Sequence, residues 1–228
     1  TIKNCRIAGG NYIVDIRRSQ YVSVLDSNLS GSWDWGFYAE KSKGVTLANS
    51  RVENCQYRSA VALTSTTDSN ISNNVLRNNG TVQNPWGYAG GIYLSDSNRN
   101  TIAYNKITEN YRPFWSASSK DNYVAYNEMC FNKYEDYCGG SFVTQNTATG
   151  NKITSKEGAS CTWLKNQSTA CSQSCSDSDN ITGNGLVDSN KGTVTFWNGL
   201  VTTQFTDQCY AADSNYLWEY FCQNDLNR

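Results

Sequence analysis

The chain contains no histidine and one methionine, and only 17% of its residues are charged. Without histidine, neither an ordinary Ser-His-Asp triad nor a His-containing zinc site can form. The 19 basic residues nearly balance the 20 acidic ones, so the net charge of −1 gives no bulk attraction to nucleic acid or to anionic membranes. No apolar run approaches the ~20 residues of a membrane-spanning helix. We therefore expect no nucleic-acid partner, no membrane span and no metal site.

Cysteine and glycosylation sequons are plentiful by contrast. Nine cysteines and five Asn-x-Ser/Thr sequons predict an extracellular or cell-surface glycoprotein with disulfide bonds. The sequon asparagines are Asn28, Asn70, Asn79, Asn166 and Asn180. The disulfide candidates are Cys130 with Cys138, Cys209 with Cys222, and a bridge within the group Cys161, Cys171 and Cys175. The odd total leaves at least one thiol free or joined to another chain.

A pair of apolar residues, five positions apart, recurs along the sequence. The pairs are Ile2/Ile7, Val24/Leu29, Leu47/Val52, Ile71/Leu76, Ile102/Ile107, Val124/Met129 and Ile181/Leu186. A third apolar strand of alternating type follows six of these seven pairs, with the sequences YIVDI, GFYAE, AVALT, GIYLS, SFVTQ and TVTFW. Polar turns, often Asp-Ser-Asn, separate the repeats. A repeat of about two dozen residues built from short β-strands predicts a β-solenoid.

Polar residues also recur at fixed positions in each repeat. Three residues after the first apolar position come Cys5, Ser27, Ser50, Asn74, Asn105 and Asn127. Three residues after the second come Gly10, Ser32, Cys55, Asn79, Asn110 and Asn132. Coils stacked about 4.8 Å apart place equivalent residues above one another, and an amide can donate to one neighbour while accepting from the other. We predict internal hydrogen-bond ladders of asparagine at the corners of the solenoid.

This pattern resembles the right-handed parallel β-helix family of carbohydrate-active proteins, which includes pectate-lyase-like folds. The resemblance covers residues 1–154 and 180–200 and implies an all-β, single right-handed parallel β-helix of about seven or eight coils. Residues 155–179 are rich in cysteine and are expected to form a disulfide-pinned insertion, and residues 180–228 the last coils and a C-terminal cap. The fold hosts lyases, epimerases, hydrolases, adhesins and plain scaffolds, so function has to come from sites.

Aromatic residues follow the second strand of each coil. The members of this expected strip are Trp33, Trp35, Tyr57, Trp86, Tyr88, Tyr111, Trp115, Tyr134 and Tyr137. Because equivalent positions stack, we expect these rings on one side of the solenoid, where flat rings suit the apolar faces of sugars. The alternatives are a second small core under the loops, or a subunit contact.

Catalytic signals are weak. A lyase on this fold would need a base and a neutralised carboxylate, often with Ca²⁺, and Arg58, Arg112 and Tyr111 are the candidates. Acidic residues that would bind calcium are scattered, and no other cofactor is expected. A hydrolase needs two carboxylates at a defined separation. We expect Asp34 and Asp136 to lie four coils apart, which at about 4.8 Å per coil is too far for that role.

The apolar repeat is already in register at Ile2, and Thr1 rather than Met begins the sequence. We expect a processed chain or a piece of a longer one, or else self-association in which one molecule stacks head-to-tail on the next. Cys5, on the first coil, is then the candidate for an intermolecular disulfide. Our leading hypothesis is an extracellular structural or adhesive module that contacts glycans, and the rival is a lyase or epimerase acting on a uronate-containing polymer.

Overall fold

The computed structural model describes residues 1–81, 90–134, 137–139 and 145–153, together with the short strands 174–177, 193–197, 202–206, 208–209 and 217–218. Side chains are described for residues 1–81, 90–134 and 145–153. The chain divides into two compact units, Thr1–Cys171 and Ser172–Arg228. No helix among the described residues is long and apolar enough to cross a membrane.

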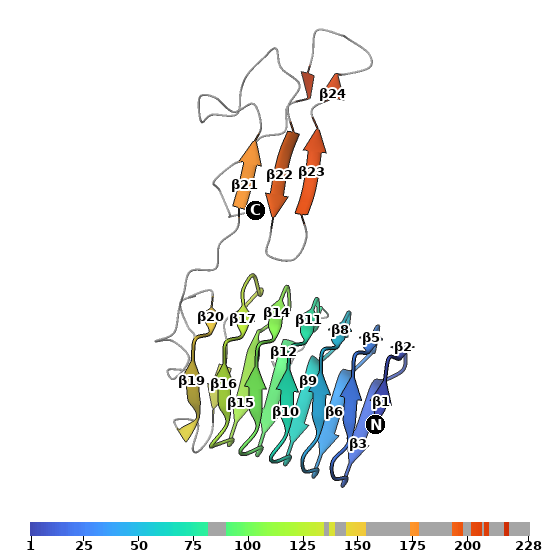
Figure 1. Ribbon diagram of the computed structural model, residues 1–228, viewed down its shortest axis with the longest axis vertical. Coiled ribbons are helices and arrows are strands. Elements are labelled where there is room, and N and C mark those ends of the chain that lie inside the picture. Colours follow the sequence, from blue (N-terminus) through green and yellow to red (C-terminus); the bar gives the residue numbers. More distant parts are fainter. Residues whose placement is uncertain are drawn as a thin grey trace. The chain divides into compact units, whose positions relative to one another are not determined.

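Three parallel sheets form the first unit, and the chain contributes one strand to each sheet in turn (Figure 1). Sheet A contains, in stacking order, β1 (Ile2–Lys3), β4 (Ser23–Leu25), β7 (Thr46–Ala48), β10 (Asn70–Ser72), β13 (Thr101–Ala103), β16 (Tyr123–Ala125) and β19 (Thr147–Thr149). Sheet B contains β2 (Arg6–Ala8), β5 (Asn28–Ser30), β8 (Arg51–Glu53), β11 (Val75–Arg77), β14 (Lys106–Thr108), β17 (Glu128–Met129) and β20 (Lys152–Ile153). Sheet C contains β3 (Tyr12–Arg17), β6 (Trp35–Glu40), β9 (Ser59–Thr64), β12 (Gly90–Ser95), β15 (Phe114–Ala117) and β18 (Tyr137–Gly139). The described residues form a parallel β-solenoid of about six turns, which confirms the predicted fold but with fewer coils than the seven or eight predicted.

The predicted apolar pairs set the register of sheets A and B. Ile71 pairs with Leu47 on one side and Ile102 on the other, and Leu76 occupies the matching place in sheet B. These side chains are completely buried in one continuous core. A slip of one residue would turn every one of them to solvent, so the apolar pattern fixes the register. In sheet C the last described strand is Tyr137–Gly139, and most of the SFVTQ segment, where we predicted a strand, lies outside the described residues.

Each corner from sheet A to sheet B contains one residue in the left-handed backbone conformation, immediately before the ladder residue. At the corner from sheet A to sheet B these are Asn4, Asp26, Asn49, Asn73, Tyr104, Tyr126 and Gly150, with φ between 49° and 62°. Asn, Asp and Gly adopt this conformation at low cost, whereas tyrosine is unusual there. The backbone geometry of the turn therefore favours the Asn, Asp and Gly residues at this position, although Tyr104 and Tyr126 also occupy it.

The predicted asparagine ladders are present. In the first row, Asn105 Nδ2 donates to Asn127 Oδ1 at 2.9 Å, and Asn74 Nδ2 donates to Asn105 Oδ1 at 3.0 Å. The second row runs through Asn79, Asn110 and Asn132 in the same way, at 2.9 and 3.1 Å. A further row that we did not predict lies before sheet A and contains Asn100, Asn122 and Asn146. All of these amides are buried, so their role is structural.

The second unit contains antiparallel strands. β22 (Thr193–Trp197) pairs antiparallel with both β21 (Ser174–Asp177) and β23 (Thr202–Thr206), and β24 (Gln208–Cys209) pairs antiparallel with β25 (Leu217–Trp218). The prediction that TVTFW forms a parallel strand of a late coil is therefore wrong, because its neighbours run in the opposite direction. Most of residues 155–192, with the expected insertion and the Ile181/Leu186 pair, lies outside the described residues.

Candidate functional site

Exposed aromatic residues lie at the edge where sheet B passes into sheet C. Trp33 and Tyr57, from successive coils, stack with ring centroids 6.2 Å apart and an interplanar angle of 3°. The Tyr57 amide donates to the Trp33 carbonyl at 2.9 Å, so the stacking of the coils holds the two rings parallel. Trp33 is 53% exposed. This edge presents a flat aromatic surface to solvent.

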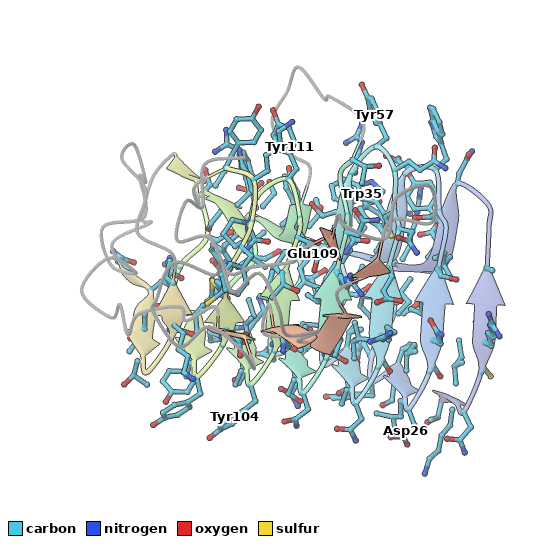
Figure 2. All side chains as sticks on the ribbon, turned by 90° about the horizontal axis from the view of Figure 1, so that it is seen from above. Asp26, Trp35, Tyr57, Tyr104, Glu109 and Tyr111 are labelled. Carbon is cyan, nitrogen blue, oxygen red and sulfur yellow. The ribbon has the colours of Figure 1, made fainter. Side chains whose placement is uncertain are left out.

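A second aromatic pair lies further along the same edge. Tyr111 and Tyr134 have centroids 4.4 Å apart, and Figure 2 shows Tyr57 and Tyr111 on the same edge of the solenoid. The Arg112 guanidinium lies within 6 Å of both Tyr111 and Tyr134 rings, and so does the Lys133 ammonium. Cations on ring faces are favourable and place hydrogen-bond donors beside the rings. We call Trp33, Tyr57, Tyr111 and Tyr134 the aromatic edge.

Two predicted members of the strip lie elsewhere, on the outer face of sheet C. Trp35 begins β6 and is only 3% exposed, and its ring packs against Tyr38 at 5.8 Å and Tyr93 at 5.2 Å. Register places Ala62 between Tyr38 and Tyr93, so the indole covers the space that this small residue leaves. Trp35 is thus a packing residue, and its placement in an exposed strip was wrong.

Trp115 continues the row on sheet C. It lies in β15 and stacks on Tyr93 with centroids 4.5 Å apart and an interplanar angle of 10°. Its partner in β18 is Tyr137, whose side chain lies outside the described residues, as do Trp86 and Tyr88. Sequence reasoning missed Tyr12, Tyr38 and Tyr93, although the strict alternation of the third strand already turns the last two outward.

Asp34 and Arg58 form the most buried ion pair beside the aromatic edge. Arg58 Nε lies 2.7 Å from Asp34 Oδ1, and its guanidinium is 5.1 Å from the centre of the Trp35 ring. Burial raises the pKa of the Asp34 carboxyl, while Arg58 and a hydrogen bond with Tyr12 offset part of that rise. Arg58 is therefore held in place by a carboxylate and a ring, as a positioned cation beside the edge.

A small polar pocket of about 210 Å³ adjoins Tyr111. Glu109 and Lys133 line it, together with Thr81 and ladder residues of sheet B. Arg77 Nε donates to Glu109 Oε2 at 2.9 Å. Glu109 occupies a left-handed corner position, with φ 58°, where earlier coils have Gly or Asn. The pocket combines a carboxylate and an ammonium group next to an aromatic ring, which are groups that recognise hydroxyls.

The family described as "Right handed beta helix region" matches residues 1–129. The chain belongs to this right-handed β-helix family. No curated protein matches the chain. The match covers the coils that contain Trp33, Tyr57 and Tyr111, so the aromatic edge is part of the β-helix itself.

Catalytic groups do not converge in the described part of this β-helix. Asp34 and Glu109 belong to coils that are three apart, or ~14 Å at the usual strand spacing, which exceeds the separation of the two carboxyl groups in glycosidases. Arg58 and Arg112 are two coils apart, and Tyr111 lies in the coil of Arg112, away from Arg58. Asp136 lies outside the described residues. Among those residues, no three Cys, Asp or Glu side chains come together as a metal site.

The sequon asparagines that the structure describes differ in their exposure to solvent. Asn70 is exposed on sheet A, and Asn28 is partly exposed at the start of β5. Asn79 is completely buried, and its Nδ2 donates to Val52 O and to Asn110 Oδ1. A glycan on Asn79 is incompatible with this ladder, so that candidate is wrong for the folded chain. Asn166 and Asn180 lie outside the described residues.

Two described cysteines have free thiols. Cys5 is partly exposed, and Cys55 is buried, which raises the pKa of its thiol to about 11. Cys130 is buried and is not among these free thiols, but the side chain of its expected partner Cys138 is not described. The pairing Cys130–Cys138 therefore stays a prediction. The other candidates, Cys161, Cys171, Cys175, Cys209 and Cys222, lie outside the residues with described side chains.

Proposed function

We propose that this β-helix is an extracellular or cell-surface module that binds a glycan along the aromatic edge. The observation that carries the proposal is the parallel pair Trp33 and Tyr57, which stacks across successive coils while Trp33 stays exposed. An indole left in water at this position contributes little to the core, whereas its face suits the apolar face of a pyranose.

The polar groups beside the rings support a sugar ligand. Arg112 and Lys133 flank the Tyr111 and Tyr134 pair, and Glu109 adds an acceptor in the adjoining pocket. A sugar ring needs an apolar platform with hydrogen-bonding groups at its rim, and this edge repeats that arrangement along the solenoid. The regular stacking of coils would let one extended chain contact several platforms at once.

Binding to immobilised polysaccharides, followed by calorimetry on the best ligand, tests the proposal. Trp33→Ala should weaken binding by at least ~tenfold, the cost of losing one good stacking contact. Tyr21→Ala is the matched control, because Tyr21 is 71% exposed at a different corner. Equal affinity of the Trp33→Ala variant and the wild type would overturn the proposal, and so would equal losses in both variants.

A lyase or epimerase remains the second candidate, and one observation favours it. The Asp34 carboxyl has a raised pKa because it is buried, and it contacts Arg58 and Tyr12, which is a grouping suited to proton transfer. Incubation with uronate polymers, with and without calcium, should then give unsaturated products that absorb in the near ultraviolet if the protein is a lyase, or deuterium at C5 in heavy water if it is an epimerase. Absence of both signals in every mixture would exclude this candidate.

Head-to-tail self-association stays a prediction. Electron microscopy of the unreduced protein at high concentration tests it, since filaments would support assembly and discrete particles would contradict it. An unchanged oligomeric state in Cys5→Ser would exclude an intermolecular disulfide at Cys5.

A further inference from the structure

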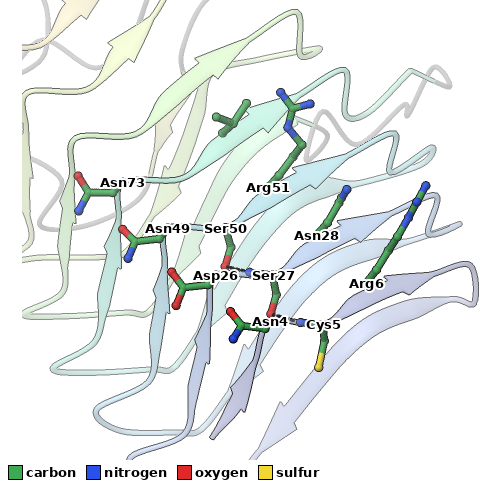
Figure 3. A pocket seen from close by; sticks show the side chains of 11 residues that line it. Asn4, Cys5, Arg6, Asp26, Ser27, Asn28, Asn49, Ser50, Arg51 and Asn73 are labelled. Carbon is green, nitrogen blue, oxygen red and sulfur yellow. Dashed lines mark hydrogen bonds between the residues drawn. The ribbon is translucent and has the colours of Figure 1, made fainter.

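A polar groove runs along the corner from sheet A to sheet B, over the first four coils (Figure 3). Its volume is about 450 Å³. One wall is the row of corner residues Asn4, Asp26, Asn49 and Asn73, and the other is the row of strand-B residues Arg6, Asn28, Arg51 and Val75. Figure 2 places Asp26 and Tyr104 at the edge opposite Tyr57 and Tyr111, so this groove is separate from the aromatic edge.

The serine hydroxyl groups and backbone amides on the floor of the groove make hydrogen bonds to one another. Ser27 Oγ accepts from the Cys5 amide and Ser50 Oγ accepts from the Ser27 amide, both at 3.1 Å. Figure 3 shows the side chains of Asn4, Asp26, Asn49 and Asn73 in one row and those of Arg6, Asn28 and Arg51 in the other. A ligand in the groove would therefore meet walls that are polar except at Val75.

The two arginines of the groove are spaced by the solenoid. Arg6 pairs in register with Asn28, which in turn pairs with Arg51, so the arginines are two strands apart, or ~10 Å. Among the described residues no carboxylate lies within ion-pair distance of Arg6. Arg51 Nη1 pairs with Glu53 Oε1 at 3.3 Å, and the two side chains are 47% and 15% exposed. The Arg6 guanidinium is thus available to an anionic ligand, and the exposed Arg51 guanidinium can bind a second acid group while it keeps or exchanges its contact with Glu53.

The negative charge of the acidic residue that lines the groove is partly offset by a lysine. Asp26 lies in the opposite wall, and Lys3 Nζ is 3.7 Å from its carboxylate. The other members of that wall are amides, which donate to and accept from hydroxyl groups. One row therefore suits acid groups at intervals of two coils, and the facing row suits the hydroxyls between them.

We propose that this groove binds a linear acidic polysaccharide that has one acid group per disaccharide. Arg6 and Arg51 hold successive acid groups, and the amide wall contacts the hydroxyls of the intervening sugar. An extended disaccharide has a length close to the two-coil spacing, so that consecutive acid groups meet consecutive arginines. This second site is distinct from the aromatic edge in position and in the charge of its ligand.

Hyaluronan, with one carboxylate per disaccharide, is the probe, and dextran is the neutral control. The protein is produced in a host without N-glycosylation, so that Asn28 in the groove wall stays bare. Alkylation of Cys5 by iodoacetamide, followed by mass spectrometry of its peptide, reports occupancy because Cys5 lies in the groove with a free thiol. Hyaluronan should slow this alkylation and dextran should not.

Calorimetry then tests the arginines. Arg6→Gln combined with Arg51→Gln should weaken hyaluronan binding at least ~tenfold, since hydrogen bonds to charged groups are the stronger ones. Arg18→Gln combined with Lys41→Gln, which also removes two exposed cations but at another corner, is the control for net charge and should bind like the wild type. Binding should also weaken as salt is added.

Two outcomes would overturn the proposal: no protection of Cys5 by hyaluronan, or equal losses in the groove and control variants. Trp33→Ala separates this site from the aromatic edge, because it should leave hyaluronan binding and Cys5 protection unchanged. Loss of both in Trp33→Ala would assign the acidic ligand to the aromatic edge and remove the groove as a site.

Discussion

The asparagine ladder makes a quantitative prediction at Asn105. Its side chain makes four hydrogen bonds: Nδ2 donates to Ile71 O and Asn127 Oδ1, and Oδ1 accepts from the Asn74 amide and from Asn74 Nδ2, all between 2.8 and 3.0 Å. The residue is 1% exposed, so water cannot replace these partners. Asn105→Ala should therefore strand polar groups on both neighbouring coils.

The cost follows from which groups lose their only side-chain partner. The Asn74 amide and the Ile71 carbonyl oxygen would be left without this bond in a buried position, at about 1–3 kcal/mol each. Asn74 Nδ2 keeps its bond to Leu47 O, and Asn127 Oδ1 keeps its bond from the Asn105 amide, so they add less. We expect Asn105→Ala to lower the free energy of unfolding by about 4 kcal/mol.

Serine at the same position should recover about half of the loss. Ser50 shows how, because its Oγ accepts from the Ser27 amide at 3.1 Å and donates within its own coil to Ala48 O at 2.9 Å. In Asn105→Ser the hydroxyl can accept from the Asn74 amide but cannot reach the carbonyl of the previous coil. The expected loss is about 2 kcal/mol.

Hydrogen exchange and urea denaturation together provide the assay. Exchange at the Asn74 amide reports the local opening that the ladder prevents, and the urea midpoint reports the stability of the whole solenoid. Asn70→Ala, which replaces an exposed asparagine of β10 in the preceding coil, is the control and should change stability by less than about 0.5 kcal/mol. An alanine variant within about 1 kcal/mol of the wild type, or a serine variant no better than alanine, would refute the reasoning.

Three further predictions concern packing, modification and pH. Gly91→Ala should cost about 1–3 kcal/mol in urea denaturation, because a Cβ there would clash with the Ile107 side chain; a stability equal to wild type would contradict it. Expression in a glycosylating host should give a glycan on Asn70 and none on Asn79, as read by peptide mass spectrometry, and a folded protein with a glycan on Asn79 would contradict the buried ladder. The folded-state pKa of Asp34 is raised, so its protonation stabilises the fold below the unfolded pKa and that stability is lost as pH rises through the folded pKa. In Asp34→Asn this part of the pH dependence should disappear from urea midpoints measured from pH 3 upward, and identical profiles would contradict the assignment.

The fold was predictable because the same sequence pattern recurs in every coil. Each coil places an apolar pair and a polar corner at the same spacing, so Ile71 and Leu76 identify their neighbours without any knowledge of the rest of the chain. The ladder before sheet A was not predicted, because its residues precede the apolar pair that identifies each repeat. Asn100, Asn122 and Asn146 each lie two residues before the first apolar position of their coil.

The candidate site was less predictable, because stacking fixes where a strand lies but not where a long side chain ends. Trp35 and Tyr38 belong to one strand, yet the indole reaches across Ala62 to Tyr93, two coils away. The size of an alanine on the intervening strand determines this, and no local pattern records it. The strand Thr193–Trp197 illustrates the same limit, since alternation is identical in parallel and antiparallel sheets and the partner is not encoded locally.

The asparagine ladders also give the solenoid a dipole along its axis. In every row the Nδ2–H bond runs from an earlier coil to a later one, as in the steps from Asn74 to Asn105 and from Asn105 to Asn127. The rows through Asn79 and through Asn100 run the same way. Their amide dipoles add head to tail, as peptide dipoles do in a helix, and each bond polarises the next. Each described row is therefore polar along the solenoid axis, with every amide oxygen directed to the preceding coil, so the two directions along the stack are not equivalent.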